Sequence, residues 1–236
     1  MNPILHELAR KQWLWSATSV KQHAQQRLSS DFTALEQALN SGFPTAGMIH
    51  IQTYLACGEL GLFIDILREQ EKAKNQMDKH RFWAFICPPG MPNAEYFLSH
   101  NIDLTQLLIL NETSFEEALW SAEQCAKSGA CAGVFLWQKH INHLHVKKLE
   151  LASLRGQCYC CWFNDNQQLQ SNLPLSLSLS LARKGDDIIL KINKQKTGWS
   201  RQTIKLNRPF KCQSSIKLSA HKPRLAKAKV VNLHPR

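Results

Sequence analysis

The sequence lacks the features of a membrane or secreted protein. None of its apolar runs approaches the ~20 residues of a transmembrane helix. The longest near mid-chain, Cys131 to Trp137, has the length of a buried strand. The N-terminus, MNPILHELARKQWLW, has neither an apolar signal core nor a small-residue cleavage site. We therefore expect a cytoplasmic protein that makes no membrane contact.

The cysteines and histidines lack the spacing of a disulfide framework or a metal site. The eight cysteines are scattered, so in a reducing cytosol we interpret them as small buried hydrophobic residues. Cys158 and Cys161 form a C-x-x-C, but a second pair is missing and the neighbouring residues indicate a strand. His140, His143 and His145 have no carboxylate or cysteine nearby in sequence to complete a ligand set. We predict no metal ion.

Carboxylates are missing from the last fifth of the chain. Asp187 is the last acidic residue, and 13 of the 29 Lys and Arg residues follow it. The first 187 residues hold 16 basic and 18 acidic residues, so the net charge of +11 comes entirely from the C-terminal region. This distribution indicates a nearly neutral globular part that carries a basic extension.

The chain is long enough for one large domain with appendages, with 236 residues of which 44% are apolar. A helix is predicted over residues 4–28, within an N-terminal segment 1–28. Between residues 29 and 165, strands alternate with helices, which predicts an α/β core with a mostly parallel sheet covered by helices. The predicted strands are 48–54, 81–87, 107–110, 132–137 and 158–163, and the predicted helices are 59–74, 93–100, 114–128 and 140–154. Ser114 with Glu117 matches a capping box, and Gly129 matches the C-cap of the same helix.

The pattern changes after Asn164. Leucine and serine alternate strictly over residues 175–181, which predicts a half-exposed strand. Further strands are predicted at 188–192 and 203–206, so that residues 166–206 form a small antiparallel appendage on the core. Residues 207–236 are basic, contain prolines and lack periodicity, and we predict that they form a disordered tail.

The loop after the first predicted core strand lacks the residues that bind nucleotide phosphates. It lies where a P-loop protein would carry G-x-x-x-x-G-K-[ST], but it contains Gly58, Glu59 and Gly61 without the lysine or the hydroxyl residue. Glu59 adds a negative charge where phosphates would lie. We interpret this degenerate P-loop as a turn that packs strand against helix, with Glu59 at the helix N-terminus.

Two further requirements of ATP hydrolysis are unmet. A metal-binding carboxylate is expected at the end of a core strand, but the strand at 134–137 is followed by Gln138 and Lys139. The strand ending at Cys87 leads into two prolines, without an acid to activate water. We therefore predict a protein that is not an enzyme and has no cofactor. Loose nucleotide binding through loop amides remains an alternative.

Two groups of residues are candidates for binding a partner. Trp13 and Trp15 lie on the predicted N-terminal helix and either anchor a protein partner or cover a sheet edge. The basic tail either binds DNA nonspecifically, presents a short protein-binding motif around Val230, Val231 and Leu233, or increases solubility. The candidate tail residues are Lys222, Arg224, Lys227, Lys229 and Arg236.

Four segments between residues 28 and 206 resemble those of a known protein family. They are GFPTAGMIHI, GELGLF, FWAFICPPGMPNAEYFLSHNIDLTQLLIL and, most specifically, EEALWSAEQCAKSGACAGVFLW. On these segments, residues 28–206 resemble the ImuA/SulA-related group of bacterial SOS-response proteins. The resemblance implies a RecA-like fold without complete nucleotide motifs, and it supplies no catalytic residues.

The two branches of this group imply different functions. ImuA-type proteins are accessories of error-prone translesion DNA synthesis, so the expected partners are RecA, a Y-family-like polymerase subunit and an error-prone polymerase. SulA-type proteins block septation by binding FtsZ, and they are typically shorter. Because the chain carries the strands at 175–206 and the basic tail, we favour a non-catalytic ImuA-type accessory, with a SulA-type cell division inhibitor as the alternative.

Overall fold

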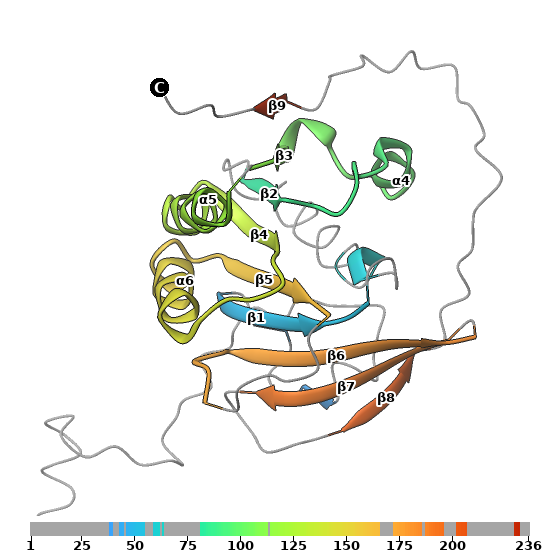
Figure 1. Cartoon of the computed structure of the whole chain (residues 1–236). Helices are drawn as coiled ribbons and strands as arrows, with labels where there is room; N and C mark the ends of the chain where they lie inside the picture. The colour runs from blue at the N-terminus through green and yellow to red at the C-terminus, as the bar shows by residue number, and fades with distance from the viewer. Residues whose placement is uncertain are drawn as a thin grey trace, which may run out of the picture.

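The computed structural model of this protein contains one nine-stranded sheet with helices on both faces (Figure 1). It describes residues 38–39, 43–44, 46–54, 59–61, 63, 81–112, 114–165, 172–185, 187–195, 202–206 and 229–231. The predicted N-terminal helix at 4–28 and most of the predicted helix at 59–74 lie outside the described residues.

The sheet is mostly parallel, as the alternation of strands and helices predicts. Its strands follow the order β8-β7-β6-β1-β5-β4-β2-β3-β9, and only the pairs β6–β7 and β7–β8 are antiparallel. The strands are β1 (Gly47–Gln52), β2 (Phe82–Ile86), β3 (Leu107–Leu110), β4 (Cys131–Trp137), β5 (Tyr159–Asn164), β6 (Leu177–Lys184), β7 (Asp187–Gln195), β8 (Thr203–Leu206) and β9 (Lys229–Val231). The predicted α/β class with antiparallel strands toward the C-terminus is therefore confirmed.

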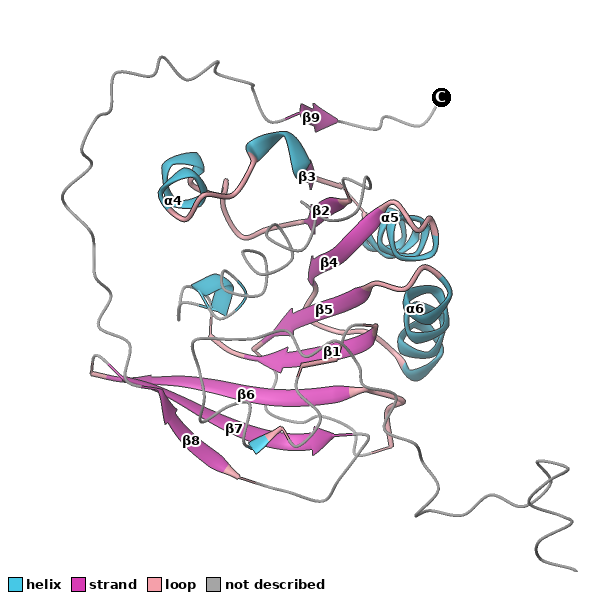
Figure 2. Cartoon of the chain, turned by 180° about the vertical axis from the view of Figure 1, so that it is seen from behind, coloured by secondary structure: helices cyan, strands magenta, loops and turns pink. Residues whose placement is uncertain are grey.

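Helices α5 (Phe115–Lys127) and α6 (His143–Arg155) lie side by side over one face of the sheet. Helix α4 (Ala94–Ser99) lies on the opposite side, followed by the short 3₁₀ helix η1 (Leu104–Gln106) (Figure 2). Each face buries its own apolar cluster, so the central strands are covered on both sides. This double burial explains their nearly continuous apolar sequences.

The predicted helix ends are partly confirmed. Ser114 and Glu117 form the capping box of α5, and Gly129 just beyond it has a φ of +73°, which suits glycine. Helix α6 begins at His143, three residues later than predicted, because the side chain of Asn142 caps it by accepting from the His145 backbone N–H at 2.9 Å. His140 therefore precedes the helix.

The cluster on the α4 side is rich in aromatic rings. Phe135 on β4 stacks on Phe85 of β2 with ring centroids 4.9 Å apart, and its ring lies 6.0 Å from that of Tyr159 on β5. Gly133 gives these rings their space, because a Cβ there would lie 2.6 Å from the Tyr159 ring. The glycine in an otherwise bulky strand is thus required by packing.

The C-terminal strands extend the core sheet. β6 pairs in parallel with β1, so β6, β7 and β8 continue the same sheet and do not form a separate layer. The prediction of a half-exposed strand at 175–181 is wrong, because Ser176 and Ser178 are buried as well as the leucines. The alternation separates two buried faces, one apolar and one built from hydrogen-bonded serines.

The tail contributes one strand. Residues Lys229–Val231 form β9, which pairs in parallel with β3 at the sheet edge. The prediction of a disordered tail is therefore wrong for these three residues, since an open strand edge offers backbone partners that need no sequence periodicity. The rest of the tail, 207–228 and 232–236, lies outside the described residues.

Candidate functional site

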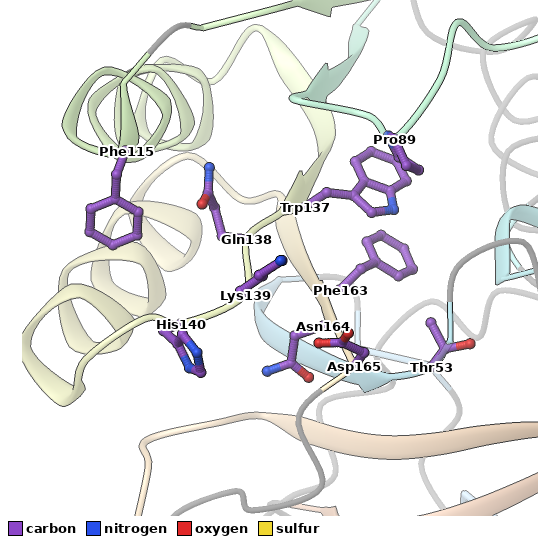
Figure 3. Close-up of a pocket in the computed structure, with 10 residues that line it drawn as sticks. All are labelled: Thr53, Pro89, Phe115, Trp137, Gln138, Lys139, His140, Phe163, Asn164 and Asp165. Carbon is purple, nitrogen blue, oxygen red and sulfur yellow. The ribbon is translucent and has the colours of Figure 1, made fainter.

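A cavity of about 630 Å³ opens at the carboxyl ends of β1, β2, β4 and β5 (Figure 3). In open α/β sheets, ligands bind outside the carboxyl ends of the strands, so the position of this cavity makes it the candidate binding site. The lining residues are Thr53, Pro89, Phe115, Trp137, Gln138, Lys139, His140, Phe163, Asn164 and Asp165.

Stacked aromatic rings form one wall of the cavity. Trp137 and Phe163 face each other in the register of β4 and β5, with ring centroids 4.7 Å apart and planes 13° apart. Phe85 continues the stack, 6.1 Å from Trp137. Both wall residues are nearly buried, with exposed fractions of 8% for Trp137 and 2% for Phe163. A rigid apolar wall at this place suits a flat or apolar group.

Polar side chains line the rest of the cavity. Lys139 follows β4, and Asn164 ends β5 with Asp165 directly after it. In Figure 3 Lys139 lies to the left of the Phe163 ring, and Asn164 and Asp165 lie below that ring. Thr53 follows β1, and its backbone N–H donates to the Asn164 carbonyl at 2.8 Å. The cavity thus holds one lysine ammonium and one carboxylate, from two neighbouring strands.

A buried histidine stands behind this polar side. His50 of β1 is fully buried, with its Nε2 2.9 Å from Asn164 Oδ1 and its Nδ1 3.0 Å from Ser178 Oγ. Because Asn164 Oδ1 can only accept, Nε2 carries the proton and Nδ1 accepts from the Ser178 hydroxyl. Burial lowers the pKa of His50 to about 4, against a smaller opposing effect of its hydrogen bond with Asn164. The neutral imidazole therefore fixes the orientation of Asn164 at the cavity.

A second buried polar group connects α6 to the sheet. Glu150 accepts from the Ser176 hydroxyl at 3.0 Å and from the backbone N–H of Met48. These bonds attach the helix to β1 and to the segment before β6. Since Glu150 is 8% exposed and does not line the cavity, we assign it a structural role.

The sequence-predicted site residues are only partly described. Glu59 lies in a helical turn and is 6% exposed, and its Oε2 has no hydrogen-bond partner among the described residues. Gly61 follows in the same turn, and Gly58 lies outside the described residues, as do Trp13, Trp15, Lys222, Arg224, Lys227 and Arg236. Lys229 is placed as the first residue of β9, far along the sheet from the cavity.

The cysteines and histidines occupy separate places. Burial raises the pKa of the Cys160 and Cys161 thiols well above the usual range, and it raises the pKa of Cys158 to about 12, so these thiols are unreactive when folded. Of the three clustered histidines, His140 lines the cavity, whereas His143 and His145 lie in the first turn of α6. Within the described ranges, no three potential ligands of the His, Cys, Asp or Glu type gather closely enough to hold a metal.

Sequence reasoning missed the polar residues at and behind the cavity. Asn164 and Asp165 directly follow a predicted strand, so the rule on strand ends could have identified them. His50 and Ser178 carry no such signal, because their pairing depends on β6 lying beside β1 across 128 residues of sequence.

In the part of the chain that the structure describes, no helix is long and apolar enough to cross a bilayer.

Comparisons with known proteins identify the fold. Neither a family model nor a curated protein matches this sequence. Among solved structures, the RadB recombinase is similar over 75% of this chain and 94% of its own, with a TM-score of 0.57 and 12% identity. SulA from Pseudomonas aeruginosa is similar over 49% of this chain and 96% of its own, with a TM-score of 0.38 and 19% identity. The similarity to RadB, together with the strand order, shows that the chain has a RecA-like fold.

Proposed function

We propose that this protein is a non-catalytic accessory of the bacterial SOS response to DNA damage, of the ImuA type. It acts in error-prone translesion synthesis by binding proteins, with RecA, a Y-family-like polymerase subunit and an error-prone polymerase as the partners. Its basic tail adds contacts to DNA. The protein acts in the cytoplasm.

The observation that carries this proposal is the composition of the strand ends in a RecA-like sheet. β4 is followed by Gln138 and Lys139, and β2 leads into Pro88 and Pro89, with Pro89 in the cavity wall. Phosphoryl transfer needs a carboxylate that holds Mg²⁺ and a group that orients water. The ends of β4 and β2 supply neither group, and the carboxylate that lines the cavity, Asp165, follows β5 instead. The aromatic wall and the prolines in these places support binding rather than hydrolysis.

The ImuA assignment is supported by the sequence resemblance. Its most specific segment, residues 116–137, forms nearly all of α5 and all of β4. It therefore covers both a helix on the surface and a central strand beside the cavity. Because the segment includes a whole strand and nearly a whole helix of the folded domain, it supports common ancestry of the domain and not only of a short motif.

Deletion of the gene tests the proposal. The deletion strain should lose most damage-induced mutagenesis, measured as the frequency of rifampicin-resistant colonies after ultraviolet irradiation, and a plasmid copy should restore it. Mutagenesis that is unchanged by the deletion would contradict the proposal. In parallel, overexpression without filamentation and without an effect on FtsZ polymerisation would exclude the SulA-type alternative.

The DNA contact has a separate test. Truncation before Asn207 removes most of the C-terminal Lys and Arg residues and should weaken binding to duplex DNA. For the intact chain, the logarithm of affinity should fall linearly with the logarithm of salt concentration, because each neutralised phosphate releases counterions. An affinity that does not change with salt, or with truncation, would leave the tail without a role in DNA binding.

Weak nucleotide binding is a second candidate function, favoured by the polar side of the cavity. Thr53, Lys139 and Asp165 offer a hydroxyl, an ammonium and a carboxylate at the strand ends. A fluorescent ATP analogue should then bind, and Lys139→Ala should weaken it, with Lys184→Ala on β6 as the control. Equal titrations for the two variants would exclude binding in this cavity.

A further inference from the structure

The outer surface of helices α5 and α6 exposes several large apolar side chains. On the side away from the sheet, Trp120 of α5 is 58% exposed, Leu144 of α6 is 67% exposed, and Leu151 and Leu154 are 59% and 42% exposed. Both helices cover the same face of the sheet and are seen nearly end-on, side by side, in Figure 1. Large apolar side chains gathered on one surface mark an interaction site. We call this surface the α5–α6 face.

The leucines follow the helical repeat. Leu144 and Leu151 are seven residues apart and Leu154 follows three residues later, so they form one stripe along α6. Lys147 and Lys148 lie between the first two leucines, one turn from each. The leucines therefore form a row along α6, with two ammonium groups beside its N-terminal half.

The two helices carry opposite charge on this face. The exposed charged residues of α6 are all basic, namely Lys147, Lys148 and Arg155, and its one carboxylate, Glu150, is buried. α5 instead exposes Glu116 and partly exposes Glu123 one turn on either side of Trp120. Lys127, at the end of α5, lies 3.9 Å from Glu123. The acidic and aromatic half of the face thus lies beside a basic and leucine-rich half.

We propose that the α5–α6 face is the interface of a homodimer, in which α5 of each copy lies against α6 of the other. A two-fold axis that runs parallel to the helices and passes between them produces this arrangement. It places α5 of one copy over α6 of the other, and α6 of the first copy over α5 of the second. Trp120 then packs against the leucine stripe of the second copy, and Glu116 and Glu123 face Lys147 and Lys148. Such self-complementarity is the requirement of an interface between identical subunits related by a two-fold axis.

A second copy fits this face better than a single acidic helix from another protein. An acidic helix would complement α6, but it would be repelled by Glu116 and Glu123 on α5. The chain's own C-terminal region is basic and would be repelled by α6. Only a partner with one acidic and one basic half satisfies both helices. The inference concerns assembly and does not depend on the proposed function.

The test uses two charge-reversed variants of the full chain. The first, E116K/E123K, makes α5 basic, and the second, K147E/K148E, makes α6 acidic. Wild-type protein should have twice the mass of the 27.0 kDa chain in size-exclusion chromatography with light scattering. Each variant alone should be monomeric, because its own α5 and α6 now carry like charges. An equimolar mixture should recover the dimer, since both halves of the mixed interface are again attractive.

Matched controls separate this result from general effects of charge or unfolding. K184E/K191E changes two exposed lysines of β6 and β7 by the same total charge as K147E/K148E and should remain dimeric. Circular dichroism melting should show each variant folded. Trp120→Ala should weaken dimerisation roughly 30-fold, as expected of an aromatic anchor at the centre of an interface.

Three results would overturn the proposal. The first is a wild-type monomer at about 100 μM, where a dimer with a micromolar Kd would predominate. The second is a dimer that persists in both charge-reversed variants, which would place the contact on another face. The third is a mixture of the two folded variants that stays monomeric, which would show that the reversed charges never faced each other across two copies.

Discussion

Acid should destabilise this protein through His50, and the size of the effect follows from the pKa. The imidazole is buried between Ser178 and Asn164, and burial lowers its pKa to about 4, from 6.5 in the unfolded chain. Between pH 6.5 and pH 4 the imidazole therefore binds a proton in the unfolded state but not in the folded state. The free energy of unfolding falls as the pH falls through this range, and the loss levels off below pH 4. Relative to pH 7, linkage gives a loss of about 2 kcal/mol at pH 5 and about 3 kcal/mol at pH 4.

The measurement compares wild-type protein with His50→Leu by urea unfolding, followed by tryptophan fluorescence, between pH 7 and pH 4. At pH 7 the variant should be less stable by about 1–3 kcal/mol for each buried partner left without a hydrogen bond, at Ser178 and Asn164. The stability difference should then shrink toward acid by about 2 kcal/mol at pH 5, because only wild-type protein loses the histidine contribution. Other titrating groups are common to both proteins and cancel. A difference that stays constant with pH, or grows toward acid, would refute the assignment of a neutral buried His50.

Three further predictions follow from packing, burial and strand pairing. Gly133→Val should lower the free energy of unfolding by about 1–3 kcal/mol, or more, because its Cβ would meet the Tyr159 ring; an unchanged urea midpoint would contradict this. Cys160 and Cys161 should resist iodoacetamide at pH 8 in the native protein and react in urea, as measured by mass spectrometry of peptides; rapid native labelling would show that they are not buried. Val230→Pro removes a backbone donor from β9 and should reduce amide exchange protection along β3, whereas unchanged protection would mean that β9 contributes nothing there.

The sequence was sufficient for the features that depend on local pattern. The five core strands were predictable, because strands buried on both faces need uninterrupted apolar residues, and so were the helices α4, α5 and α6. The predicted helix 59–74 stays a prediction, since most of it lies outside the described residues. The capping box at Ser114 was predictable for the same kind of reason, since both of its partners lie within one turn of helix. The start of α6 was predicted too early, because several polar residues precede Asn142 and the sequence does not show which of them caps the helix.

The candidate site was less predictable. Sequence showed that the strand ends near Gln138 and Pro89 lack the acids of a hydrolase, but it could not show that Trp137 and Phe163 stack beside them. That contact depends on the register of β4 against β5, which parallel strands set through connections far apart in sequence. The serines of β6 illustrate the same limit, because an alternating strand has the same sequence pattern whether its polar face meets water or buried partners such as His50.

By itself, therefore, the sequence determined the α/β class, the missing phosphate-binding residues and the uneven charge, since each depends on neighbouring residues or on composition. Tertiary structure alone decided that His50, Asn164 and Ser178 form one buried group, that β9 pairs with β3, and that acidic α5 and basic α6 lie side by side on one surface. Each of these needs segments far apart in the chain to meet, and only the packing of the whole sheet brings them together.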